Sequence, residues 1–264
     1  MRIATAQIQI ENCPKSNAAQ MKKFIHGAAQ DDADVIHFPE SSLSGYVKAQ
    51  ITDWSDVDWN ALEDELHNIQ DLCAAQNIGA VIGSAHNHTG MDRPFNCLYV
   101  IDSNGNMVAR YDKRFCSHSE ITDWYSAGKI PVVVDIQGFK LGFALCIEIQ
   151  FPEIFMEYER MGVDCVLLSA YSDSEMFAVQ AQGHAACNNY WISYSVPANI
   201  SDKQSSCFIG PDGSVVGVCE QGKAGYIVNK IDPNDPQWAI PCTKARPWRR
   251  LAREGNIYDD FQEK

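Results

Sequence analysis

Residues 139–170 read FKLGFALCIEIQFPEIFMEYERMGVDCVLLSA, and two kinds of pattern alternate in this stretch. The runs 139–146 and 163–170 are short and largely apolar, as buried strands are. Between them, residues 151–162 begin with a proline near the first turn of a helix and end at Gly162, where a helix commonly stops. The stretch therefore predicts a strand, a helix and a second buried strand, a unit from which layered α/β folds are built.

The same rhythm continues along the chain in both directions. In the first half we expect strands at 2–9, 34–40 and 78–86, helices at 16–30 and 60–77, and a hairpin over 97–113. In the second half we expect a helix at 174–190, strands at 190–196 and 225–232, and a hairpin over 206–220. The two halves share one plan, although no sequence identity between them marks a repeat. Two sheets that face each other, with helices outside, would bury these apolar runs on both sides.

The bulk composition limits the possible classes of protein. The chain has 264 residues, 45% of them hydrophobic, and no low-complexity linker divides it. We expect a single domain over 1–264, with 243–264 as a C-terminal tail. The net charge of −13 argues against a nucleic-acid or membrane-surface partner. Without a membrane-length apolar stretch or a signal-like amino terminus, and with ten scattered cysteines, the sequence favours a cytoplasmic protein with reduced thiols.

Three residues with reactive side chains stand where apolar strands are expected to end. Glu40 follows VIHFP, Lys113 follows MVARYD, and Cys146 follows KLGFAL. In layered α/β folds, sites tend to assemble where strands end. A thiol becomes a nucleophile when a carboxylate takes its proton, and an ammonium group lowers the thiol pKa and holds the oxyanion of an attacked carbonyl. The backbone N–H of Ile147 could supply a second oxyanion donor.

Each of these residues also has a simpler interpretation when it is taken alone. Cys146 is then a packed core thiol, Glu40 a solvated carboxylate, and Lys113 a surface lysine after a hairpin. His86 and His88 form a pair of metal-ligand type, but no third ligand has metal-like spacing. The sequence therefore predicts no metal site.

Three motifs together resemble the nitrilase, or carbon–nitrogen hydrolase, superfamily, in its amidase-like branch. They are FPE at 38–40, YDKR at 111–114 and LCIEIQFPE at 145–153. Further similarity at 185–199, AACNNYWISYSVPAN, extends the resemblance over most of residues 2–232. The resemblance implies an α/β fold, a four-layer α-β-β-α sandwich of two mixed sheets with internal pseudo-symmetry.

The resemblance also implies a cofactor-free reaction in which a small amide is hydrolysed through a cysteine thioester. Carried over by motif, Glu40 is the general base, Lys113 the transition-state stabiliser and Cys146 the nucleophile. Many members have a second active-site glutamate between the lysine and the cysteine, and Glu120 is the candidate here.

The sequence departs from the family pattern after the cysteine. Glu148 keeps an acidic residue, but Gln150 stands where an arginine that helps to bind a substrate carboxylate is common. We expect Glu148, Gln150 and Tyr171 to border the substrate. The neutral side chain of Gln150 favours neutral or cationic amides over amides that carry a carboxylate.

Several alternatives fit the same residues. A nitrile would reach the same thioester, an acyltransferase would replace water with an acceptor amine, and a non-catalytic binding protein would keep only the fold. Family members commonly pair, so we expect a homodimer or a higher homo-oligomer. The basic segment 243–255, TKARPWRRLAREG, is either a solvated surface helix or a contact with a partner subunit.

Overall fold

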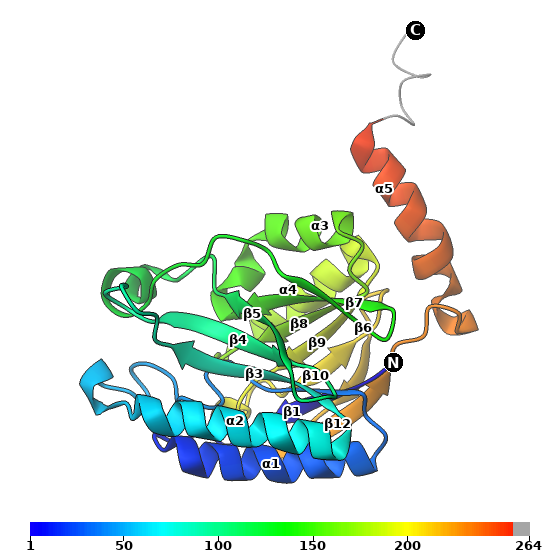
Figure 1. Ribbon diagram of the computed structural model, residues 1–264. Coiled ribbons are helices and arrows are strands. Elements are labelled where there is room, and N and C mark those ends of the chain that lie inside the picture. The colour runs from blue at the N-terminus through cyan, green and yellow to red at the C-terminus, as the bar shows by residue number, and fades with distance from the viewer. Residues whose placement is uncertain (256–264) are drawn as a thin grey trace, which may run out of the picture.

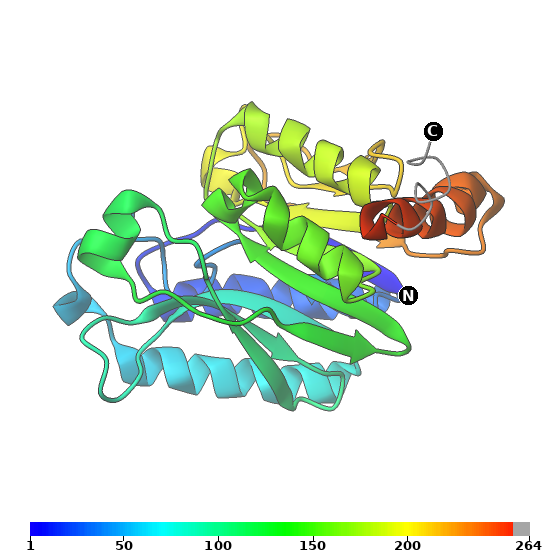
Figure 2. The same cartoon turned by 90° about the horizontal axis from the view of Figure 1, so that it is seen from above.

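The protein, described here by a computed structural model of residues 1–255, is built from two six-stranded sheets that lie face to face. Helices cover the outer face of each sheet, which gives four layers (Figures 1 and 2). This arrangement confirms the α-β-β-α sandwich expected from the sequence. Residues 256–264 of the expected C-terminal tail lie outside the described residues.

The first sheet has the strand order β12-β1-β2-β3-β4-β5 and carries helices α1 and α2. Its strands are β1 (Arg2–Gln7), β2 (Val35–His37), β3 (Gly79–His86), β4 (Phe95–Ile101), β5 (Met107–Asp112) and β12 (Gly225–Lys230). The helices are α1 (Pro14–Gln30) and α2 (Trp59–Gln76).

The second sheet has the order β11-β10-β9-β8-β7-β6 and carries helices α3 and α4. Its strands are β6 (Val133–Ile136), β7 (Phe139–Leu145), β8 (Cys165–Ser169), β9 (Trp191–Ser195), β10 (Cys207–Ile209) and β11 (Val215–Val218). The helices are α3 (Pro152–Arg160) and α4 (Glu175–Asn188), and α5 (Arg246–Glu254) follows the last strand.

The two sheets repeat one pairing pattern, which is the internal pseudo-symmetry expected from the sequence. In the first, β1, β2 and β3 are parallel, β12 pairs antiparallel with β1, and β4 and β5 continue antiparallel beyond β3. In the second, β7, β8 and β9 are parallel, β6 pairs antiparallel with β7, and β10 and β11 continue antiparallel beyond β9. Both sheets are therefore mixed.

The hairpin that joins β6 to β7 was missed in the sequence analysis. Its turn residues Gln137 and Gly138 both have positive φ, 54° and 81°. Asparagine or aspartate before glycine is the usual sequence signal for such a turn, and glutamine in that place gives a weak one. The strand that completes the second sheet therefore has little signature in the sequence.

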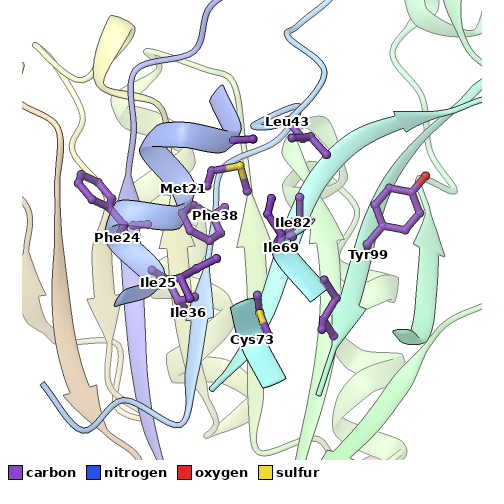
Figure 3. Close-up of a cluster of buried hydrophobic side chains, with 14 of the residues drawn as sticks. Met21, Phe24, Ile25, Ile36, Phe38, Leu43, Ile69, Cys73, Ile82 and Tyr99 are labelled. Atoms are coloured by element: carbon purple, nitrogen blue, oxygen red, sulfur yellow. The ribbon is translucent and has the colours of Figure 1, made fainter. Parts of the chain in front are cut away.

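The space between the first sheet and its two helices is filled by one apolar cluster (Figure 3). Met21 and Ile25 of α1 and Ile69 of α2 pack against Ile36 and Ile82 of the sheet, and all five side chains are fully buried. Burying such side chains stabilises the fold by about 1.5–3 kcal/mol each. This packing holds β2 and β3 in place, and β2 leads directly to Glu40.

The layer between the two sheets changes from apolar to polar along the strands. Every second side chain of a strand points to the same face of the sheet. If one such side chain is apolar and the next is polar, the layer on that face changes from apolar to polar along the strand. The apolar members are Ile3, Val35, Leu167 and Trp191, and the polar members two residues later are Thr5, His37, Ser169 and Ser193. The polar end of this layer is the end at which β2 and β8 finish.

No helix within residues 1–255 is long and apolar enough to cross a membrane. All ten cysteines carry free thiols.

Helix α5 lies beside α3 and α4, as the view from above shows (Figure 2). Its arginines contact Glu159, a buried residue of α3: Arg250 at 2.7 Å, Arg253 at 3.2 Å and Arg246 at 3.7 Å. Three cations of the basic segment therefore surround one carboxylate of the same chain.

We expect the substitution Glu159→Gln to lower the free energy of unfolding by about 1–3 kcal/mol, because it removes the negative charge that Arg246, Arg250 and Arg253 share. Urea unfolding measures the change. The control is Glu153→Gln on the same helix, where the side chain is exposed. If Glu159→Gln and Glu153→Gln have equal stability, the arginine cluster does not hold α5.

Candidate active site

Four of the predicted site residues converge at one edge of the sandwich. Glu40 lies three residues after β2, and Lys113 and Cys146 follow β5 and β7 directly. Glu120 begins a short π-helical turn over Glu120–Trp124. Glu40 and Lys113 are fully buried, while Glu120 is 2% and Cys146 8% exposed. The first sheet thus supplies Glu40 and Lys113, and the second supplies Cys146.

Lys113 connects two carboxylates. Its Nζ donates to Glu40 Oε1 at 2.9 Å and to Glu120 at 2.8 and 3.0 Å. The backbone N–H of Ser117 also donates to Glu120, at 2.7 Å. Removing one member of a buried ion pair leaves its partner's charge unpaired and is strongly destabilising. The stability of the fold therefore depends on Glu40, Lys113 and Glu120 together.

Glu40 is positioned by three donors. Besides Lys113, the side-chain amide of Asn96 donates to Oε1 at 2.8 Å, and the backbone N–H of Tyr171 donates to Oε2 at 2.8 Å. The backbone around Glu40 also passes very close to β3. A Cβ atom on Gly83 would lie 2.2 Å from the carbonyl oxygen of Pro39, so only glycine fits there.

The backbone of Tyr171 links Glu40 to Cys146. Its N–H contacts the Glu40 carboxylate, and its carbonyl oxygen lies 4.0 Å from Cys146 Sγ, which donates to it. Tyr171 was expected to border the substrate, and its backbone lies between the two reactive side chains. These backbone contacts have no signature in the sequence, since any residue type could make them.

Cys146 has a backbone conformation that non-glycine residues rarely adopt. Its φ is 48°, in the left-handed region, and it begins a 3-10 turn over Cys146–Gln150. Such strain persists only where the surroundings enforce it, and it is common at functional sites. Ile147, the predicted oxyanion donor, is the next residue of this turn.

Glu148, which we expected to border the substrate, lies in a network of buried hydrogen bonds. Its fully buried carboxylate accepts hydrogen bonds from the Tyr111 hydroxyl at 2.8 Å and from three backbone N–H groups. These belong to Leu145 and Arg114, both at 2.7 Å, and Phe115 at 3.1 Å. One carboxylate therefore ties the residue before Cys146 to the residue after Lys113.

Gln150 is not brought to the cluster either. Its side chain is exposed and lines a surface hollow between α3 and α4, together with Met156 and Cys187. The expected preference for a neutral substrate rested on Gln150 standing where a family arginine would bind a substrate carboxylate, and this geometry does not place Gln150 beside the charged cluster.

Burial and charge set the protonation states of the central residues. Burial opposes the charge on Lys113, but the carboxylates of Glu40 and Glu120 outweigh it and hold its pKa well above the usual range. Burial also acts against ionised Glu120, yet Lys113 and the Ser117 N–H keep the pKa of Glu120 lowered. For Glu40, burial dominates over Lys113 and raises the pKa. Glu40 is thus the carboxylate that accepts a proton more readily.

The thiol of Cys146 rests in its protonated form. Burial raises its pKa, and the negative charge of Glu40 adds to this effect, while Lys113 opposes it. A thiolate in this site therefore requires a base that takes the proton.

Two tyrosine rings stack on each other beside the site. The rings of Tyr46 and Tyr171 stack with centroids 4.4 Å apart and planes 7° apart. Gln50 donates to the Tyr171 hydroxyl at 2.9 Å, and Lys48 donates to the hydroxyl of Ser119, the residue before Glu120. The loop after Glu40 thereby closes against the loop that carries Glu120.

Asn96 and Tyr46 were not identified from the sequence. Asn96 lies in β4 and is fully buried. A polar residue within an otherwise apolar strand is a sequence feature that could have indicated a site residue. Tyr46 lies in a loop and has no distinguishing pattern. In residues 1–255 no group of three or more His, Cys, Asp or Glu side chains forms a metal site, and His86 instead pairs with the Tyr99 hydroxyl at 2.8 Å.

Known proteins with similar sequences are hydrolases. A hydrolase of Mycobacterium tuberculosis is 26% identical over 180 residues, 64% of this chain and 61% of that protein, so this match spans less than two thirds of the relative's length. A hydrolase of Pseudomonas protegens is 26% identical over 250 residues, 87% of this chain and 84% of that protein. A chloroplastic omega-amidase of Arabidopsis thaliana is 22% identical over 249 residues, 87% and 67% of the two chains.

The fold is also that of a solved amidase. A variant of the Nesterenkonia AN1 amidase from the nitrilase superfamily superposes with a TM-score of 0.79 at 19% identity, covering 95% of this chain and 97% of that one. Residues 2–239 match the family described as carbon-nitrogen hydrolase. This match covers most of the sequence and includes the whole cluster around Lys113, so the chain belongs to the carbon–nitrogen hydrolase family.

Proposed function

We propose that the protein is a thiol amidohydrolase that cleaves the C–N bond of a small amide through a thioester on Cys146. The observation that carries the proposal is the buried Lys113 ammonium between Glu40 and Glu120, with Cys146 joined to Glu40 through the backbone of Tyr171. Relatives named as amidases support the same class of reaction.

In the first half of the reaction, Glu40 takes the proton of the Cys146 thiol, and the thiolate attacks the amide carbonyl carbon. The ammonium of Lys113 and the backbone N–H of Ile147 hold the oxyanion. Protonated Glu40 then gives its proton to the departing nitrogen, the C–N bond breaks, and ammonia or an amine leaves a thioester on Cys146.

In the second half, Glu40 takes a proton from water, and the resulting hydroxide attacks the thioester. The C–S bond breaks, the carboxylic acid is released, and the proton on Glu40 returns to the sulfur. Glu120, with its lowered pKa, stays ionised throughout and keeps Lys113 charged. Glu148 acts on the reaction only by positioning the residues before Cys146 and after Lys113. No cofactor takes part.

The substrate that fits best is uncharged. Glu40 and Glu120 outnumber Lys113 among the charges that contact one another at the site, so a carboxylate on the substrate would be repelled.

A panel of small amides tests the proposal through release of ammonia. It should include one matched pair, a short aliphatic amide and the same amide with a terminal carboxylate, and the uncharged member should have the higher kcat/KM. Added hydroxylamine separates hydrolysis from acyl transfer, and the matching nitriles test the nitrilase alternative. If no amide or nitrile is turned over, the binding-protein alternative replaces the proposal.

The pH dependence of activity follows from the raised pKa of Glu40. The reaction needs ionised Glu40, so kcat/KM should fall as the pH falls through that pKa, with a midpoint above the usual value of 4.5. Glu120 shifts in the opposite direction and Lys113 titrates far higher, so neither sets this limb. The profile is measured between about pH 4 and pH 9, with circular dichroism as the control for unfolding. A midpoint at or below 4.5 would contradict the assignment of Glu40 as the base.

We also propose that the protein forms a homodimer in the cytoplasm. Met176 and Val179 on α4 are 60% and 54% exposed, and Gly183 and Cys187 continue the same exposed face at helical spacing. The ten free thiols support a cytoplasmic location, where cysteines stay reduced. Sedimentation velocity at micromolar concentration should show a dimer that Val179→Glu weakens, while Val216→Glu, an exposed position on β11, leaves it intact. A monomeric parent protein would exclude this interface.

A further inference from the structure

The two halves of the active site belong to different sheets. Glu40 follows β2 of the first sheet, whereas Cys146 and Tyr171 follow β7 and β8 of the second. Backbone hydrogen bonds fix neighbouring strands within each sheet, but the two sheets meet through side chains. The distance between base and nucleophile therefore depends on what joins the sheets close to the site.

A chain of buried polar groups joins them at that point. His37, the last residue of β2, contacts Ser169 Oγ through Nε2 at 2.7 Å and Ser193 Oγ through Nδ1 at 2.8 Å. Ser193 Oγ lies 2.7 Å from Thr5 Oγ1, and Ser169 Oγ donates to the carbonyl oxygen of Phe38 at 2.9 Å. All four polar side chains are fully buried.

The hydrogen bonds determine where the imidazole proton lies. Ser169 has one hydroxyl proton, which it gives to Phe38, so it accepts a proton from His37 Nε2–H. His37 Nδ1 then accepts from Ser193, and Thr5 donates to Ser193 in turn. The ring is neutral, because burial lowers the pKa of His37 to about 3.

Resting on the proposed function, we propose that His37 is a positioning residue that locks the end of β2 to the end of β8. Glu40 lies three residues beyond His37, and Tyr171 lies two residues beyond Ser169. The His37–Ser169 contact therefore holds in register the two segments that meet again where the Tyr171 N–H binds Glu40. A hydrogen bond fixes distance and direction, whereas an apolar contact in the same place would let the sheets slide.

Three variants separate positioning from stability. His37→Leu removes the contact between His37 and Ser169, and Ser169→Ala removes both that contact and the hydrogen bond from Ser169 to the Phe38 carbonyl oxygen. Both variants should lower kcat by about tenfold to a hundredfold, with KM changed less than about threefold, because misplaced groups slow the chemical steps. Ser193→Ala is the control. It removes a buried hydrogen bond of the same ring but keeps the link to Ser169, so it should lower stability and leave kcat within about threefold. Rates are compared well below each melting temperature.

Two further measurements do not depend on amide turnover. Nitrogen NMR of the His37 ring should show Nε2 protonated and Nδ1 unprotonated at pH 7. Iodoacetamide should alkylate Cys146 at least about tenfold more slowly in His37→Leu and Ser169→Ala than in Ser193→Ala, since thiolate formation needs a positioned base.

These results can overturn the inference in several ways. It fails if folded His37→Leu or Ser169→Ala keeps the kcat of the parent protein, if Ser193→Ala loses as much kcat as they do, or if all three variants are alkylated at equal rates. A ring protonated on Nδ1 contradicts it even if none of the variants folds. If the parent protein hydrolyses nothing, the proposed function fails, and the tautomer and the alkylation rates still decide the role of His37.

Discussion

Replacing Cys146 with alanine is expected to abolish amide hydrolysis, with a loss of rate on the order of 10⁴-fold or more. Without the sulfur no thioester forms, and Glu40 and Lys113 are left with no nucleophile to act on. The side chain is small and lies at the end of β7, so the free energy of unfolding should change by no more than about 1–2 kcal/mol. Steady-state ammonia release and urea unfolding measure the two effects.

Two other cysteines provide controls for this prediction. Cys116 Sγ lies 3.9 Å from the carbonyl oxygen of Lys113, and burial raises the pKa of Cys116 to about 12. Cys187 is exposed on α4. Cys116→Ala and Cys187→Ala should both keep most of the activity. Appreciable turnover by Cys146→Ala, or loss of turnover in Cys116→Ala alone, would show that the nucleophile is misassigned.

The second large effect concerns the charged pair. Glu40→Gln removes the base and Lys113→Met removes the oxyanion charge, and each should lower kcat/KM about a hundredfold or more. Because both residues act on the same sulfur and the same oxyanion, the loss in the double variant should be far smaller than the product of the single losses.

Lys113→Met has a cost that the sequence alone did not suggest. It leaves two buried carboxylates, Glu40 and Glu120, without their cation, and breaking such a buried group costs about 3–5 kcal/mol of stability. The kinetic cycle should therefore be measured well below the melting temperature of this variant. Losses that multiply would mean that Glu40 and Lys113 act on separate steps.

The fold could be predicted from the sequence to the extent that its apolar patterns are long and periodic. The strand-helix-strand unit over 139–170 and its counterparts appear in the structure with ends shifted by a few residues. The hairpin at Gln137–Gly138 was missed because its turn lacks the usual asparagine or aspartate.

The sequence predicts those site residues whose side chains are themselves reactive, and it does not predict those that act by positioning others. The tripeptide FPE occurs twice, yet Glu40 is fully buried against Lys113 and Glu153 is exposed in the first turn of α3. Glu148 holds backbone N–H groups and Tyr171 acts through its own backbone, and contacts of this kind leave no trace in residue type. The sequence also does not show which strands of the two sheets face each other, so it did not reveal that Thr5, His37, Ser169 and Ser193 form one polar end of the layer between them.

The central claim is that a covalent acyl group forms on Cys146, and intact-mass spectrometry after mixing with small amides tests it most directly. Acid-quenched samples should gain the mass of the substrate's acyl group, and peptide mapping should locate it on Cys146 and not on Cys116. An amide that is hydrolysed with no adduct at any time after mixing, or an adduct on a different residue, would contradict the account.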